Sequence, residues 1–525
     1  MQLTGQQLIG QSGYSASGTP IWAINPATGE QLQPGYLSGG KKEVDHACEL
    51  ANSAKIDFRN TSTEERAVFL ESIAQEIMNL GDTLVTRCMQ ETGLPQGRIE
   101  GERGRTCGQL KLFAQLLRSG EGFDARIDPS LPERQPLPRA DLRYHKIALG
   151  PVAVFGASNF PLAFSVAGGD TAAAFAAGCP VIVKAHSAHP GTAELVGKAI
   201  QNAVSSCQLP EGVFSLLYGS GNNLGQALVT DPRIKAVGFT GSRSGGTALM
   251  RLAQARPEPI PVYAEMSSIN PVVLLPQALK NKASKLGEEF IASLTMGAGQ
   301  FCTNPGLILA IKSKALDNFI EAAHQTIEQA PAQTMLTPGI YQAYTNGLTS
   351  LNNNGSISSS SKGLSSDQPN TCQAAFFVTQ ASKFLNDERL ANEVFGASSV
   401  LVECDDFEQL KNLTQQLEGQ LTACLHMEKA DLTMAQNLLP TLEEKAGRVM
   451  VNSWPTGVEV CHAMVHGGPY PATSDARSTS VGSAAIDRFL RPVCYQNMPQ
   501  ELLPTDLRDG NPLGISILVD GQRSL

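Results

Sequence analysis

The sequence has no long hydrophobic run, no excess of positive charge and no closely spaced cysteine pairs. No segment approaches the ~20 consecutive apolar residues that a helix needs to cross a bilayer, and Met1–Gly10 lacks the basic patch and apolar core of a secretory signal. We therefore expect no membrane partner. The formal net charge of −9 offers no basic surface for nucleic acid, so it favours a small-molecule ligand.

The eleven cysteines show neither the spacing of a disulfide scaffold nor a CxxC metal site. Because their number is odd and they are scattered, we expect free thiols in a reducing compartment, hence a cytoplasmic location, and no metal site.

What the sequence does contain is ordinary globular composition, with 525 residues, 42% of them hydrophobic and 17% charged. This is enough for two or three domains with a large core. Residues 43–118 have helical periodicity, and from residue 148 onward short β-branched runs alternate with helices. This pattern predicts a doubly wound parallel sheet, whose ligand binds at the carboxyl ends of the strands. The expected strands are Val152–Phe155, Pro180–Val183, Val213–Leu217 and Ala236–Phe239.

A second α/β region is expected after residue 271, with strands at 272–275, 306–310, 376–378 and 400–402. Two other segments differ in composition. Residues 124–147 are rich in proline and charge, which suits a surface arm or hairpin. The low-complexity stretch Asn352–Gly363 is interpreted as a flexible surface loop.

Two glycine-rich segments follow expected strands. Phe239–Gly246 precedes a predicted helix over 247–254, so its backbone N–H groups are suited to a phosphate, although a tight turn that binds nothing would show the same glycines. Gly219–Gly225 has its last glycine one residue late for a dinucleotide fingerprint and is interpreted as a loop.

Polar residues also stand at expected strand ends. Lys184 could bind a nucleotide there, and the alternative is an ordinary surface charge. Asn159 could donate a hydrogen bond to an oxyanion, and the alternative is a residue that caps a turn. Cys302 differs from the other cysteines because its neighbours are small and polar, so we expect a reactive thiol on an exposed turn. Glu265, expected at a neighbouring strand end, is suited to activating water against a covalent intermediate.

Taken in order, these residues resemble the aldehyde dehydrogenase superfamily over nearly the whole chain. The matching motifs are Ser158–Pro161, Phe239–Ser242, Gly299–Cys302 and Glu393–Gly396.

The resemblance implies a nucleophilic role for Cys302, an oxyanion-holding amide in Asn159 and a water activator in Glu265. The aldehyde would pass through a thiohemiacetal and a thioester on the cysteine. Lys184, Ser187, Gly241, Ser242, Glu393 and Phe395 would contact the cofactor.

Two residues depart from the common pattern of the family. Ser187 stands where many NAD-dependent members have a glutamate, which favours NADP and leaves NAD possible. His466, in Val465–Ala472, stands where a phenylalanine is usual; it would polarise the thiol or contact substrate, or would merely pack.

Finer resemblance, over 147–163 and 488–497, is to the 2-oxoglutarate semialdehyde (2,5-dioxopentanoate) dehydrogenases, close to a bacterial NADP-dependent long-chain aldehyde dehydrogenase. Such a substrate needs a cation for its far carboxylate. Arg105 and Gln109, four residues apart on an expected helix, are candidates, with a surface ion pair as the alternative for Arg105.

The implied fold is α/β and aldehyde dehydrogenase-like, with a Rossmann-like cofactor domain, an α/β catalytic domain and a small oligomerisation element. The predicted bounds are 1–123 with 148–262, then 263–480, then 124–147 with 481–525. The implied function is NADP-dependent oxidation of an aldehyde to a carboxylate by a homodimer or homotetramer, and the finer resemblance implies 2-oxoglutarate semialdehyde as substrate and 2-oxoglutarate as product. The alternatives are a broad-range or fatty aldehyde dehydrogenase and a catalytically silent binding protein on the same fold.

Overall fold

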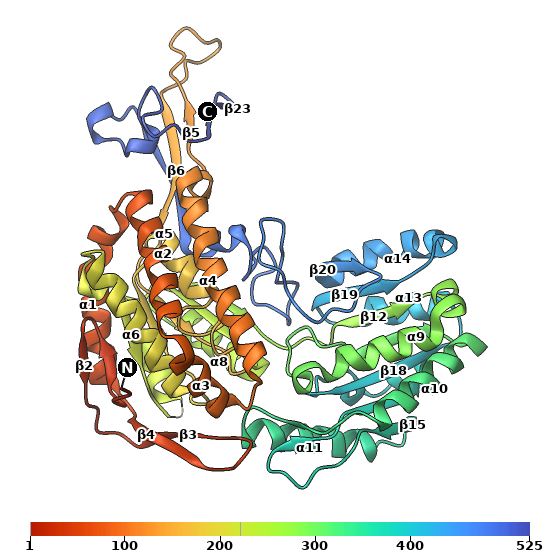
Figure 1. Ribbon diagram of the computed structural model, residues 1–525. Coiled ribbons are helices and arrows are strands. Elements are labelled where there is room, and N and C mark those ends of the chain that lie inside the picture. The colour runs from red at the N-terminus through yellow and green to blue at the C-terminus, as the bar shows by residue number, and fades with distance from the viewer. Residues whose placement is uncertain (1, 221, 525) are drawn as a thin grey trace.

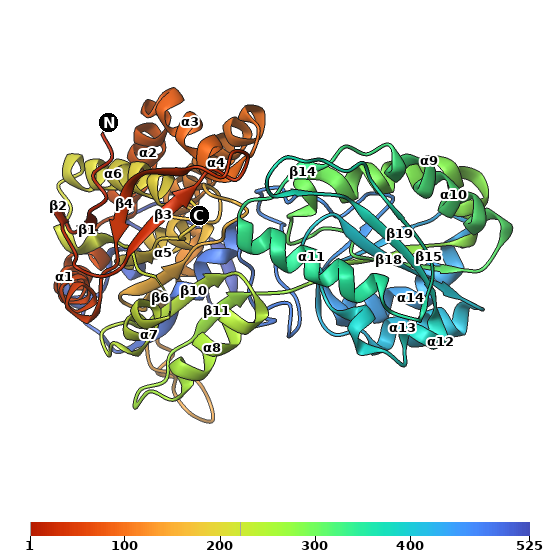
Figure 2. The ribbon, with the colours of Figure 1, turned by 90° about the horizontal axis from the view of Figure 1, so that it is seen from below.

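The computed structural model describes residues 2–220 and 222–524. They form two lobes side by side, with an arm that rises from the first lobe (Figure 1). The view from below separates the lobes and shows α11 (Pro338–Asn352) at the side of the second lobe that faces the first (Figure 2). No helix among these residues has both the length and the apolar composition to cross a membrane.

The first lobe is built on a sheet in the order β11-β10-β7-β8-β9-β1-β2. The five strands from β11 to β9 are parallel, and β1 runs antiparallel to β9. Successive strands β8 and β9 lie on one side of β7, whereas β10 and β11 lie on the other, so β7 and β10 flank a topological switch point where ligands bind. The bounds are β1 Gln7–Ile9, β2 Ser12–Tyr14, β7 Val152–Phe155, β8 Val181–Lys184, β9 Phe214–Leu217, β10 Ala236–Thr240 and β11 Val262–Glu265.

Helices cover both faces of this sheet, and the central parallel strand β7 is accordingly buried on both sides. In β7, Val152 and Val154 join the core formed with α2, α5 and α6, while Ala153 and Phe155 join the core formed with α1, α7 and α8. The bounds are α1 Lys41–Arg59, α2 Thr63–Asn79, α3 Gly81–Thr92, α4 Gln96–Ser119, α5 Gly169–Ala177, α6 Pro190–Ser206, α7 Asn223–Thr230 and α8 Arg243–Gln254.

The second lobe has its own sheet, in the order β15-β17-β18-β13-β12-β19-β20. One face packs against α9 and α10, and the other against α13 and α14. The bounds are β12 Pro271–Leu274, α9 Pro276–Thr295, β13 Leu307–Ile311, α10 Lys314–Glu328, β15 Ile357–Lys362, β17 Ala375–Gln380, α12 Ala381–Phe384, β18 Ser398–Cys404, α13 Phe407–Gln416, β19 Gln420–His426, α14 Leu432–Lys445 and β20 Ala446–Val451.

The arm is a sheet in the order β21-β6-β5-β22-β23. The hairpin strands β5 (Arg126–Asp128) and β6 (Leu142–Ala148) pair with β22 (Ile517–Val519) and β21 (Leu490–Gln496), and β23 is Gln522–Ser524. The expected arm at 124–147 therefore lies beside the C-terminal segment (Figure 1). The division of the chain into domains at the bounds given above stays a prediction.

Two local predictions are wrong. The stretch at 352–363 is not a loop throughout, because β15 pairs antiparallel with β17 at the edge of the second sheet. An edge strand needs hydrogen bonds on one side only, and serine-rich composition does not reveal that pairing. Likewise Asn223 already begins α7, so the end of Gly219–Gly225 is helical. A ribbon of β3 (Pro20–Ile24) and β4 (Gln31–Leu37) lies along the first lobe.

Candidate active site

A cleft of about 1460 Å³, counting space open to solvent, lies where strand ends of the first lobe meet loops of the second. Its lining also includes Trp22 of β3 and Thr337 just before α11. Lys184, Arg105, Gln109 and His466 do not line it. The predicted site residues that do are Asn159, Ser187, Gly241, Ser242, Glu265, Cys302, Glu393 and Phe395.

Cys302 follows a tight turn in which Gly297, Ala298 and Gly299 all have positive φ, between 56° and 66°. A side chain at Gly299 would place its Cβ 2.3 Å from the backbone N of Ala397, so only glycine fits there. The prediction of an exposed turn is wrong, because Cys302 is only partly exposed. Burial raises the pKa of its thiol well above the usual value, with the charge of Glu265 adding to the effect. The resting thiol therefore needs a base before it can attack.

Asn270, directly before β12, holds the loop at residues 300–306, here called the Cys302 loop. Its Nδ2 donates to the carbonyls of Cys302 and Asn304, both at 2.9 Å. Asn270 is fully buried and itself has a positive φ of 49°. Its Oδ1 accepts from Ser268 Oγ at 2.9 Å and Thr422 Oγ1 at 3.0 Å. This network fixes the backbone that carries the thiol.

Glu265 ends β11, where it pairs with Thr240 of β10, and its carboxylate is buried with two partners. His466 Nε2 lies 2.9 Å from Oε1, and Ser480 Oγ donates to Oε2 at 2.9 Å. Burial alone would raise the pKa of Glu265, but the interaction with His466 and the hydrogen bonds outweigh it and hold that pKa below its usual value. Glu265 is therefore a carboxylate in the resting site.

His466 contacts both Cys302 and Glu265. It lies in the segment between β20 and β21, which has little regular structure. Its Nε2 lies 3.4 Å from Cys302 Sγ as well as 2.9 Å from Glu265. The residue is 1% exposed, and its backbone N–H donates to Thr479 Oγ1 at 2.8 Å. The imidazole can thus exchange a proton with the thiol or with the carboxylate.

Asn159 lies just past β7, at the switch point. Its Nδ2 donates to the Gln300 carbonyl at 3.0 Å, two residues before Cys302. Because an amide has two N–H groups, a second one remains for a ligand. Asn159 and the Cys302 loop are therefore connected directly.

Arg105 and Gln109 face inward from α4. The Arg105 guanidinium lies 5.0 Å from the centre of the Phe164 ring, which also has the His466 ring at 5.9 Å. Nη1 and Nη2 of Arg105 and Nε2 of Gln109 are buried and have no hydrogen-bond partner among the described residues. Burial lowers the pKa of Arg105, opposed by the charges of Glu102 and Cys302. Arg105 Nε donates to the Val458 carbonyl at 3.4 Å, but no carboxylate of the described residues forms a salt bridge with the guanidinium. A buried cation without an anionic partner favours an anionic ligand.

The strand ends on the other side of the cleft are suited to a nucleotide. At Gly241, which lines the cleft, a Cβ would lie 2.7 Å from the Phe239 ring, so a side chain does not fit there. Ser242 caps α8, its Oγ accepting from Gly245 N at 3.2 Å. Ser187 is exposed and lines the cleft. Lys184, at the end of β8, is partly buried, and burial lowers its pKa. It forms no salt bridge with any of the described residues.

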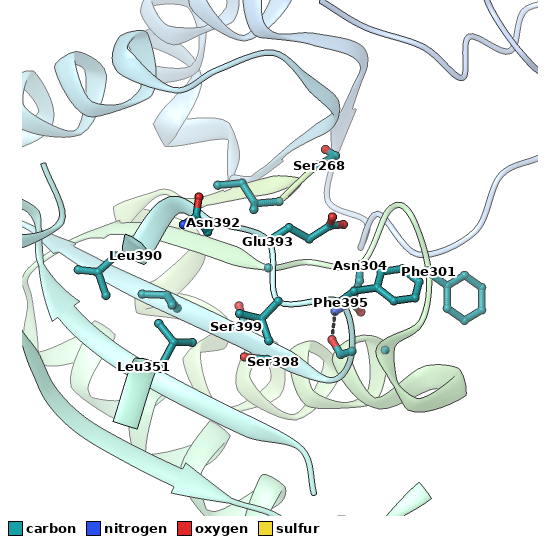
Figure 3. A pocket seen from close by; sticks show the side chains of 16 residues that line it. Ser268, Phe301, Asn304, Leu351, Leu390, Asn392, Glu393, Phe395, Ser398 and Ser399 are labelled. Atoms are coloured by element: carbon teal, nitrogen blue, oxygen red, sulfur yellow. Dashed lines mark hydrogen bonds between the residues drawn. The ribbon is translucent and has the colours of Figure 1, made fainter. Parts of the chain in front are cut away.

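Glu393 and Phe395 project from one loop beside Phe301 and Asn304 of the Cys302 loop (Figure 3). Asn304 Nδ2 donates to the Gly396 carbonyl at 3.1 Å, which ties the two loops together. Burial raises the pKa of Glu393 to about 7, against hydrogen bonds from the Ser267 side chain and the Ser268 backbone.

Two important residues were missed by sequence reasoning. Ser480 holds Glu265 from 215 positions away, and no local pattern marks it. Asn270 lies within the segment that drew attention to Glu265, and a residue directly before Pro271 was a usable signal of special backbone geometry.

Comparisons with known proteins show the family of the chain. The model of the aldehyde dehydrogenase family matches residues 14–470. The chain is 54% identical over 523 residues to "Alpha-ketoglutaric semialdehyde dehydrogenase 2" of Azospirillum brasilense, covering 99% of this chain and 100% of that one. It is 50% identical over 521 residues to "Alpha-ketoglutaric semialdehyde dehydrogenase" of Acinetobacter baylyi, covering 98% of each. A mutant aldehyde dehydrogenase C of Pseudomonas syringae, solved with NAD+ and octanal, has a TM-score of 0.79 at 20% identity, covering 94% of this chain and 97% of that one.

Proposed function

Because the chain belongs to the aldehyde dehydrogenase family, we propose that it oxidises 2-oxoglutarate semialdehyde to 2-oxoglutarate with a nicotinamide cofactor. Two relatives at 54% and 50% identity carry the name of that activity. They do not favour the broad-range or fatty aldehyde alternative. The observation in the molecule that supports the substrate best is the unpaired guanidinium of Arg105.

The substrate's far carboxylate pairs with Arg105. A buried cation without a partner is costly, and the planar guanidinium with free Nη1 and Nη2 matches a carboxylate bidentately. Gln109 Nε2, also unpartnered, adds a neutral donor for the carboxylate or the keto oxygen. Phe164 contacts both Arg105 and His466, so the proposed carboxylate site and the reacting groups share one aromatic neighbour.

The test is the ratio of kcat/KM for 2-oxoglutarate semialdehyde to that for hexanal. Arg105→Ala should lower this ratio about 100-fold, since loss of a buried charge pair costs about 2–5 kcal/mol. Arg389→Ala serves as the matched control, because Arg389 lies on the surface and pairs with Asp387. An unchanged ratio in Arg105→Ala would exclude the carboxylate site.

The proposed reaction begins at Cys302. In the resting site Nε2 of His466 carries the proton that Glu265 accepts at 2.9 Å. Before attack, solvent exchange moves that proton to Nδ1, so Nε2 is free to accept the thiol proton, and Glu265 stabilises the imidazolium that results. Sγ then adds to the aldehyde carbon, and the Asn159 amide and the Cys302 backbone N–H hold the oxyanion. A bound nicotinamide cofactor supplies the hydride acceptor. Glu265 afterwards takes a proton from the water that hydrolyses the thioester on Cys302.

NADP is the proposed cofactor, with NAD as a possible second one. Ser187 places a hydroxyl, not a carboxylate, in the cleft near the end of β8, so nothing at that position repels a 2′-phosphate. Lys184 supplies a nearby positive charge, and Glu393 and Phe395 contact the ribose and the nicotinamide ring. Ser187→Glu should raise the KM for NADP more than tenfold relative to NAD, because a carboxylate would face the phosphate.

We also infer that the chain forms a homo-oligomer through the arm. β21 is one of the two outer strands of the arm's sheet, and among the described residues it pairs with β6 alone. Such an edge is suited to pairing with another copy. Light scattering coupled to gel filtration would distinguish a monomer from a dimer or tetramer.

A further inference from the structure

Three different metal-ligand types meet at the reacting centre. Cys302 Sγ, His466 Nε2 and a carboxylate oxygen of Glu265 all lie within 4.8 Å of one another. They belong to three separate segments, with His466 164 residues from Cys302 and 201 from Glu265. The fold therefore preorganises a donor set that no metal-ligand spacing in the sequence reveals.

The spacing of these atoms is close to that of a tetrahedral zinc site. With Zn–S near 2.3 Å and Zn–N and Zn–O near 2.0–2.1 Å, tetrahedral angles require roughly 3.6 Å between sulfur and nitrogen and roughly 3.3 Å between nitrogen and oxygen. The observed separations are 3.4 Å and 2.9 Å. The sulfur and the carboxylate oxygen lie within 4.8 Å of each other, against roughly 3.6 Å in a tetrahedral site, so small side-chain movements bring the three donors around one ion.

The chemistry of the donors favours Zn2+ over Mg2+ or Ca2+, since thiolate and imidazole are soft or borderline ligands. One thiolate and one carboxylate neutralise the charge of a divalent ion, which suits a buried site. The positive charge of Arg105 nearby disfavours binding of the cation. Ser480 Oγ holds Oε2 of Glu265 and so orients Oε1. Cys302 and Glu265 line the cleft, so the ion has a route in and an open fourth position for water.

We propose that Cys302, His466 and Glu265 form a reversible inhibitory site for Zn2+. The thiol releases its proton to solvent, and the proton on His466 Nε2 moves to Nδ1, which frees the Nε2 lone pair for the ion. The thiolate binds the ion as well, so the sulfur lone pair needed for attack is occupied. His466 and Glu265 are engaged at the same time, which removes both proton acceptors of the proposed reaction. Aldehyde and zinc therefore compete for the same thiolate.

The first experiment is a titration of the reduced, metal-free full-length protein with Co2+ as a spectroscopic substitute for Zn2+. One equivalent should produce a thiolate-to-cobalt charge-transfer band in the near ultraviolet and the intense visible bands of tetrahedral cobalt. Addition of Zn2+ should displace the cobalt and abolish both. A spectrum without the charge-transfer band, or with the weak bands of octahedral cobalt, would overturn the proposal.

Variants locate the site. Cys302→Ser should abolish the charge-transfer band, and His466→Phe should weaken cobalt binding at least tenfold, since even groups that only orient metal ligands contribute about 10–100-fold. Cys494→Ser is the matched control, because Cys494 is an exposed thiol on β21, and it should bind as the parent protein does. Retention of the band in Cys302→Ser refutes the site even if His466→Phe fails to fold.

The second experiment follows turnover of hexanal after incubation with ZnCl2. Inhibition should be reversed by EDTA and relieved by increasing aldehyde, and Zn2+ should protect Cys302 from iodoacetamide. Inhibition that EDTA does not reverse would contradict the proposal. Because the cobalt spectrum requires no substrate, absence of turnover with 2-oxoglutarate semialdehyde would refute the proposed substrate and leave the metal site standing.

Discussion

His466 Nε2 lies 2.9 Å from Glu265 Oε1 in a site where His466 is 1% and Glu265 4% exposed. The same nitrogen is 3.4 Å from Cys302 Sγ, so one imidazole serves both the nucleophile and the carboxylate. In a buried pocket such a shared partner decides where the protons reside. We therefore expect both the reactivity of the Cys302 thiol and the ability of Glu265 to take a proton from water to depend on His466.

His466→Phe should slow the alkylation of Cys302 by iodoacetamide at pH 7 about tenfold. Burial and Glu265 hold the thiol pKa well above its usual value, so without a proton acceptor the thiolate forms only at higher pH. Mass spectrometry of the peptide that contains Cys302 measures the rate across pH. An unchanged pH profile would show that His466 does not accept the thiol proton.

Glu265→Gln should separate acylation from hydrolysis. An amide cannot take a proton from water, so the thioester should accumulate and steady-state turnover should fall about 10²–10⁴-fold. The first turnover should still release one equivalent of reduced cofactor as a rapid burst. Stopped-flow absorbance resolves the two phases. A burst that disappears together with the steady state would assign Glu265 to thiol activation instead.

Cofactor binding should weaken as the pH falls through 7. Glu393 has a pKa of about 7, so below that pH it loses the charge with which it would accept hydrogen bonds from ribose hydroxyls. The KM for NADP should rise several-fold between pH 8 and pH 6, and Glu393→Gln should remove this dependence. A pH-independent KM in the parent protein would contradict the prediction.

The same carboxylate should affect stability in a defined pH window. Its folded-state pKa is raised, so the folded protein binds a proton more tightly than the unfolded chain, and its contribution becomes unfavourable as the pH rises from about 4.5 through 7. Glu393→Gln should therefore raise the melting temperature more at pH 8 than at pH 5. Calorimetry at the two pH values measures the difference.

Asn270→Ala should destabilise the second lobe and lower the reactivity of Cys302. It removes both 2.9 Å hydrogen bonds to the carbonyls of Cys302 and Asn304, at a cost of about 2–4 kcal/mol for buried groups left unpaired. Asn386→Ala is the control, since that exposed amide bonds only Ser382 in its own turn. Equal denaturant midpoints for the two variants would exclude the positioning role of Asn270.

Much of the fold was predictable because its strands are buried on both faces. Val152–Phe155 is apolar throughout and matches β7, and the other three strands expected in the first lobe match to within a residue. The α/β class and the enzyme family are confirmed by the family match and the structural neighbour. β15 could not be predicted in this way, because its serines pack no core and its pairing with β17 is a long-range contact.

The candidate site divides along the same line. The sequence by itself determined the family, the α/β class and the candidate residues Cys302, Glu265 and Asn159, since short motifs carry local geometry and chemical type. Their roles stay predictions. Only the tertiary structure decided that His466 lies between the thiol and the carboxylate, that Ser480 holds Glu265, and that Arg105 is left unpaired. The contacts of His466 with Cys302 and of Ser480 with Glu265 join residues 164 and 215 positions apart. They arise from tertiary packing, which no hydrophobic periodicity within a single segment reveals.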